Sequence, residues 1–137
     1  MNMKNLIRTG LSMLVLAGVV GCSDNDPVIQ TYEVTVTNVS NSQPLSPLAV
    51  VLHSQRYSGW TIGEQAGDGL EQLAEGGDNS QFLSDATDAS AIATFSGDGV
   101  VVPGETGRVD LSVNSSTDLK LTVATMLVNT NDAFAGR

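Results

Sequence analysis

The chain is short and acidic: it has 137 residues, fifteen Asp and Glu against six Lys and Arg, and a formal net charge of −9. This length allows one small domain, and the charge makes nucleic acids and anionic lipid head groups poor partners. The charge suits cations such as calcium, although solubility alone explains it equally well. The single cysteine excludes an internal disulfide.

The first 21 residues have the composition of a secretory signal. Lys4 and Arg8 supply a basic start, and residues 11–20 are predominantly apolar. Such a run is too short to span a bilayer as a helix, which takes about 20 residues, but it fits the apolar centre of a cleavable signal. We therefore expect residues 1–21 to be removed.

Cys22 directly follows two valines and a glycine at the end of this run. The ending resembles the bacterial lipoprotein box, in which the thiol is acylated before cleavage. The resemblance implies that Cys22 anchors the mature chain to a membrane outside the cytoplasm; the alternative is an ordinary signal with a chance cysteine. Residues 22–30 then form a polar tether. Ser23 follows the cysteine directly, and a serine rather than an aspartate in this place resembles lipoproteins that are sorted to the outer membrane of Gram-negative cells.

Alternating apolar residues predict strands in the rest of the chain. The first covers residues 32–37, where Tyr32, Val34 and Val36 share one face. Residues 48–52 are apolar throughout, as expected of a strand that is buried on both faces. Further strands are expected at residues 91–95, 100–102, 108–113 and 119–128.

The middle of the chain has helical spacing instead. Asp68 is placed to cap a short helix with its apolar residues on one face, which two glycines end at 76–77. Another helical turn is expected near Phe82. Five or six strands with one helical insertion predict an antiparallel β-sandwich over residues 31–137.

Two segments resemble the spondin N-terminal domain, which occurs in F-spondins and in many bacterial secreted proteins. The first contains a His-Ser pair, a glycine-rich turn and a helix that ends in Ala-Glu-Gly. The second is a methionine-containing strand that leads into a loop with an aspartate and then a glycine. The first segment comprises residues 52–57, Trp60, Gly63 and residues 67–76, and the second comprises residues 126–136. With residues 32–38 and the turn at 44–47, the similarity covers nearly all of residues 31–137.

The resemblance implies a synaptotagmin-like sandwich of spondin type, which binds calcium in its animal members. Asp132 matches the calcium-binding loop aspartate, and Asp98 is a second candidate ligand from a neighbouring loop; the alternative is that both only stabilise tight turns. The chain departs from the animal pattern at Val128, Asn131 and Ala133. The family continues beyond this loop, which implies that the C-terminal strands are missing, in a truncated member or in a fragment.

His53, the only histidine, is followed by Ser54, but successive residues of a strand point to opposite faces. His53 therefore cannot activate Ser54, and the sequence has no Gly-x-Ser-x-Gly motif. We expect His53 to be a structural residue at a strand end, bonded to the helical insertion. Tyr57 and Trp60 are expected to anchor the insertion on the sheet rather than to form an exposed binding surface.

These features predict a non-catalytic lipoprotein of the bacterial cell envelope, periplasmic or surface-exposed, with the outer membrane favoured in a Gram-negative cell. It would display a spondin-like binding or adhesion domain to a protein or glycan partner, assisted by Ca2+. The alternative is a structural or assembly lipoprotein of the envelope without metal. A hydrolase is the least favoured reading because the sequence lacks a pairing of nucleophile and base.

Overall fold

The computed structural model describes residues 28–114 and 118–137, so the predicted signal, Cys22 and most of the tether lie outside the described residues. The described chain is mainly β, with two antiparallel sheets and two short helices. No helix in these two ranges is long and apolar enough to cross a membrane. In chain order the elements are β1 (Ile29–Thr37), β2 (Ala49–His53), α1 (Asp68–Gly76), α2 (Ser80–Asp88), β3 (Ala93–Ser96), β4 (Thr106–Asn114), β5 (Lys120–Met126) and β6 (Phe134–Gly136).

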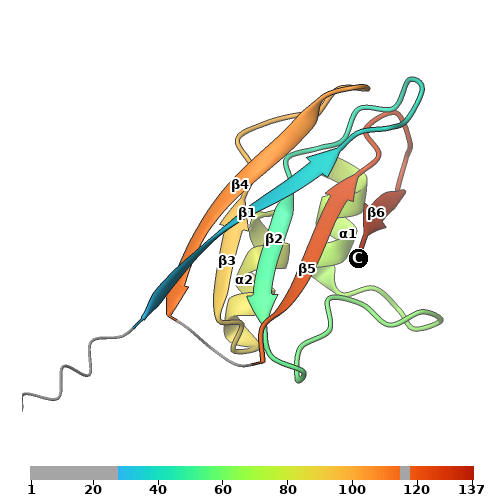
Figure 1. Ribbon diagram of the computed structural model, residues 1–137. Helices are drawn as coiled ribbons and strands as arrows, with labels where there is room; N and C mark the ends of the chain where they lie inside the picture. The colour runs from blue at the N-terminus through green and yellow to red at the C-terminus, as the bar shows by residue number, and fades with distance from the viewer. Residues whose placement is uncertain (1–27, 115–117) are drawn as a thin grey trace, which may run out of the picture.

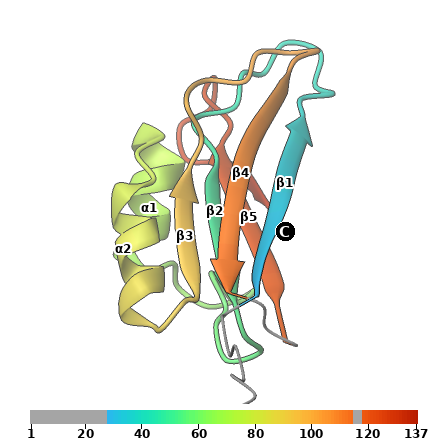
Figure 2. The same cartoon turned by 60° about the vertical axis from the view of Figure 1, so that its left-hand side comes forward.

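The elements lie in three layers, with a four-stranded sheet in the middle (Figure 2). The strand order of this sheet is β3-β2-β5-β6, and all its pairs are antiparallel. β1 and β4 form a separate antiparallel pair on one side, while α1 and α2 cover the other side. Two sheets that face each other in this way fit the predicted sandwich, and the helices form an additional outer layer.

β2 contributes to the apolar cores on both sides of the middle sheet. All five of its residues are buried. Ala49 and Val51 pack in the core under the helices, whereas Val50 and Leu52 pack in the core that faces β1 and β4. The prediction of a strand buried on both faces is therefore confirmed. Each fully buried valine or leucine contributes about 1.5–3 kcal/mol of hydrophobic stabilisation.

The strands predicted from alternation are present, with shifted ends. β1 starts at Ile29, so the last residues of the expected tether already belong to the sheet. The strand expected at 100–102 is reduced to a single bridge between Val101 and Leu45. The expected last strand stops at Met126, and the chain then turns back to form β6, which the sequence did not reveal.

The helical insertion is larger than predicted, because a second helix of nine residues follows the first. Asp68 is not the cap of α1: Gly67 occupies the N-cap position, and Asp68 lies inside the first turn, where a carboxylate favourably faces the helix dipole. The predicted C-terminal end is confirmed. Gly77 adopts a left-handed conformation with φ of 71°, which glycine takes without strain.

Gly69 brings the two helices into close contact. A Cβ atom at this position would lie 2.7 Å from the backbone N and Cα of Phe82, well inside the contact distance of carbon atoms. Phe82 and Leu73 are buried side by side in the core beneath the helices. The absence of a side chain at position 69 thus determines how closely α2 packs against α1.

We expect Gly69→Ala to lower the free energy of unfolding by about 1–3 kcal/mol, since α2 must move away from α1. Alanine would otherwise favour the helix by up to about 1 kcal/mol. Gly76→Ala is the matched control in the same helix, because a Cβ there meets nothing within 4 Å. Urea unfolding of both variants measures the difference. Equal stabilities would contradict the close approach.

Candidate functional site

Three loops meet at one end of the sheets (Figure 1). They are residues 38–48, 97–105 and 127–133. β3 and β5 both run antiparallel to β2, so the loops that follow them leave the sheet at the same end. Leu45 lies between these two loops and forms a bridge with Val101 on one side and with Leu127 on the other. This loop end carries both predicted calcium ligands, Asp98 and Asp132.

Buried polar side chains hold the loop end together. Asn38 is 2% exposed, and its amide donates hydrogen bonds to the carbonyls of Gln43 (2.7 Å) and Val101 (2.8 Å). The Thr125 hydroxyl donates to the carbonyl of Ser46 at 2.8 Å, and both residues are buried. Because buried polar groups are costly to leave without partners, these bonds fix the path of the loops.

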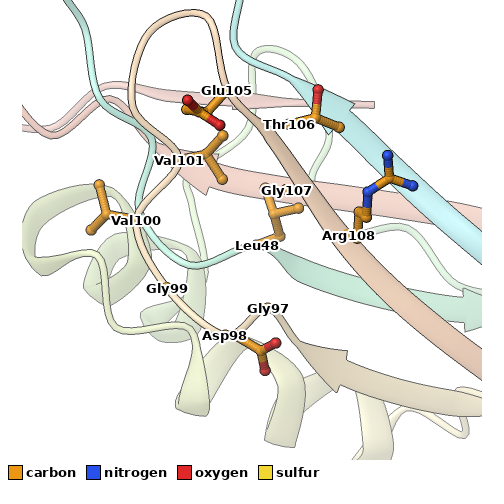
Figure 3. Close-up of a pocket in the computed structure, with 10 residues that line it drawn as sticks. All are labelled: Leu48, Gly97, Asp98, Gly99, Val100, Val101, Glu105, Thr106, Gly107 and Arg108. Atoms are coloured by element: carbon orange, nitrogen blue, oxygen red, sulfur yellow. The ribbon is translucent and has the colours of Figure 1, made fainter.

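Asp98 borders a cavity of about 420 Å³ between the 97–105 loop and the start of β4. Figure 3 shows Asp98 and Glu105 at opposite ends of this loop, with their carboxylates apart. Asp132 is exposed in the turn between β5 and β6. Among residues 28–114 and 118–137, no three His, Cys, Asp or Glu side chains gather closely enough to hold a metal ion. The calcium site stays a prediction, and carbonyl oxygens or water would have to supply most ligands.

His53 lies at the end of β2 and is 4% exposed. Its Nδ1 is 2.7 Å from the carbonyl oxygen of Ser54, and its Nε2 is 2.9 Å from Oγ1 of Thr122. A carbonyl only accepts, so Nδ1 carries the proton and, in the neutral ring, Nε2 accepts from the Thr122 hydroxyl. Both ring nitrogens are thus engaged in hydrogen bonds within the protein.

The side chain of His53 forms hydrogen bonds with Thr122 of β5 and with the adjacent Ser54. The prediction that it bonds to the helical insertion is therefore wrong. The strand register explains the difference. His53 lies opposite Lys120, so Thr122 is the diagonal neighbour on the same face of the sheet. The ring of His53 also contacts the segment that leads to the helices: it meets the Tyr57 ring edge-on at a centroid distance of 4.9 Å.

Tyr57 and Trp60 are half-buried against the core between the middle sheet and the helices. The Trp60 ring meets Phe134 of β6 edge-on at 5.2 Å, a contact that sequence reasoning missed because β6 was not predicted. Burial, and secondarily the negative charge of Asp85 on α2, raises the pKa of the Tyr57 phenol. The two aromatic side chains thus join the loop after β2 to the sheet and to the helices.

No model of a known protein family and no curated protein matches the chain. The similarity to the spondin N-terminal domain therefore depends on the residues quoted above and stays a prediction.

We expect Thr122→Val to lower the free energy of unfolding by about 1–3 kcal/mol, because the buried Nε2 of His53 loses its donor while the shape of the side chain is kept. Thr35→Val is the control: Thr35 is exposed on β1, and the change should stay within about 0.5 kcal/mol. Thermal and urea unfolding measure both variants. If Thr122→Val unfolds like Thr35→Val, the His53–Thr122 bond does not stabilise the fold.

Proposed function

We propose that the chain is a non-catalytic lipoprotein of the bacterial cell envelope that displays a spondin-type β-sandwich as a binding domain. The loop end carries this proposal: three loops converge there, and buried hydrogen bonds hold them in place. Such a preorganised surface binds with little loss of conformational entropy. β1 begins at the opposite end of the sheets, so a lipid on Cys22 would leave the loop end facing outward.

Exposed apolar side chains on the loop end favour a protein as the partner. Val39 is 91% exposed, Val100 is 56% exposed and Val102 is 49% exposed. Exposed apolar side chains on the loops of one end of a domain are a feature of sites that contact other proteins. Calcium at Asp132 and Asp98 would add a cation to this surface, whereas the alternative envelope protein without metal would use the valines alone.

The environment of His53 supports a non-catalytic role. A general base must reach a reacting group with a nitrogen that is available for its proton. His53 is buried, and both of its nitrogens already have partners in the protein. No other histidine occurs in the sequence. The only imidazole of the chain therefore stabilises the sheet, which supports a role without contact to a substrate.

We expect Cys22→Ser to abolish labelling by a palmitate analogue and to leave residues 1–21 attached, since the serine hydroxyl does not accept the lipid and acylation precedes cleavage. Ser23→Asp is the control: it keeps the cysteine and should remain labelled and membrane-bound, while moving to the inner membrane of a Gram-negative host. Continued labelling of Cys22→Ser, or its normal cleavage after residue 21, would refute anchoring through the thiol.

We expect calcium at about 5 mM to raise the free energy of unfolding by about 1–2 kcal/mol, if the site has the millimolar to submillimolar affinity of extracellular modules. Asp132→Asn should reduce this increase. Asp110→Asn makes the same charge change on exposed β4 and should leave it intact. Thermal melting with calcium, magnesium or chelator measures the effect. No shift with calcium would remove the metal from the proposal and favour the metal-free alternative.

A further inference from the structure

A groove runs along one side of the molecule, between β1 and the β5-β6 half of the middle sheet. Two cavities of about 400 Å³ and 340 Å³ follow one another along it. The first is bordered by Val34 of β1 and Leu121 of β5, and the second by Val36 and Val123. Because these pairs are one side-chain repeat apart on both strands, the cavities form one continuous side groove.

The side groove is an uncovered part of the core between the sheets. The inward residues of β4 are at most 7% exposed; they are Val109, Leu111 and Val113. Tyr32, on the inward face of neighbouring β1, is 39% exposed. Leu121 is 42% exposed, whereas its direct partner on β2, Leu52, is 5% exposed. The two-stranded sheet thus covers β2 but leaves Leu121, near the start of β5, exposed.

The outer edge of β1 borders the side groove and has no neighbouring strand among residues 28–114 and 118–137. β1 pairs with β4 over nine residues in continuous register, so every second residue of β1 directs its N–H and C=O groups to the open edge. The strand contains neither proline nor lysine, which commonly protect such edges. Its only charged residue is Glu33, whose carboxylate accepts a hydrogen bond from Arg108 at 2.9 Å.

Few charged residues border the side groove. Lys120 borders the first cavity and Arg137 borders the second, and Glu33 is the only acidic residue that lines either one. Within the part of the chain that the structure describes, the Glu33–Arg108 pair is the only salt bridge. Arg137 pairs with Val123, three residues along β5 from Lys120, or about 10 Å. Lys120 lies opposite His53 and therefore starts from the helix-side face of β5, whereas Arg137 pairs with Val123 and shares its groove-side face. Arg137 therefore favours an occupant with a carboxylate.

A second copy of the chain is a poor occupant. Centred antiparallel pairing of two β1 strands would place Glu33 opposite its own counterpart, and like charges directly opposite destabilise a strand pair. The net charge of −9 adds repulsion between copies. A single extended segment has neither disadvantage.

We propose that the side groove binds an extended strand of a partner protein, which pairs with the open edge of β1. Alternate apolar side chains of the partner strand enter the groove and cover Leu121 and Val123, while a carboxylate on the same face of the partner strand meets Arg137. Main-chain hydrogen bonds supply affinity and the alternating pockets supply specificity, as in other cases of β-strand addition. This binding requires neither calcium nor the lipid.

The probe is a fluorescent peptide, Thr-Val-Thr-Val-Thr-Asp-Thr, in which the valines and the aspartate share one face. It is titrated with the whole chain in lipid nanodiscs in the presence of a chelator. We expect saturable binding at micromolar concentrations. Two further peptides carry N-methyl groups on all valine amides or on all threonine amides. Successive N–H groups of a strand point to opposite edges, so one of these peptides should bind and the other should not. Equal binding of both would indicate apolar adsorption and overturn the proposal.

Leu121→Glu places a charge on the floor of the side groove and should weaken binding of the peptide at least tenfold. If melting shows that Leu121→Glu does not fold, Leu121→Ser is used as the variant instead. Ser112→Glu is the control, with the same new charge on the outer face of β4. Arg137→Gln should weaken binding two- to fivefold, the range of an exposed ion pair. The proposal fails if the peptide does not bind at millimolar concentration. It also fails if Leu121→Glu instead dissolves a dimer, because the occupant is then a second copy.

Discussion

The burial of β2 on both faces is the constraint on which the structure depends. Its alternate side chains enter two different cores, one under the helices and one under β1 and β4. The strand therefore requires a covering layer on each side, and a chain of this size supplies two helices for one side and two strands for the other. Asn79 joins the layers at the edge of β2, because its buried amide donates to the carbonyl of Leu48 at 3.1 Å and to Ser96 Oγ at 3.0 Å.

The two covering layers differ in how much of the middle sheet they cover. On the helix side, Tyr57, Trp60 and Phe134 extend the apolar packing over β5 and β6. On the other side, the cover stops at β1. Both sides of β2 thus contain a buried core, and His53 belongs to the helix side. The proposed surfaces for a partner are the loop end and the side groove, and strands of the two sheets support both.

Features set by local sequence could be predicted, whereas those set by pairing between distant strands could not. Alternation identified β1, β4 and β5, and the glycine at position 77 identified the end of α1. β6 has three residues and no alternation, so its pattern carries no signal. The partner of His53 depends on the register of β2 and β5. The side groove depends on β1 meeting β4, which brings together Thr31 and Ser112 from positions 81 residues apart.

The start of β1 also determines how the domain would stand on a membrane. Six residues separate Cys22 from Ile29, and even a fully extended segment of this length spans only about 20 Å. A lipid on Cys22 would therefore keep the β1 start close to the bilayer. β1 runs from that end toward the loop end, since Thr37 pairs with Thr106 next to the 97–105 loop. The side groove then extends upward from the bilayer, and a partner strand could enter it without the domain leaving its anchor.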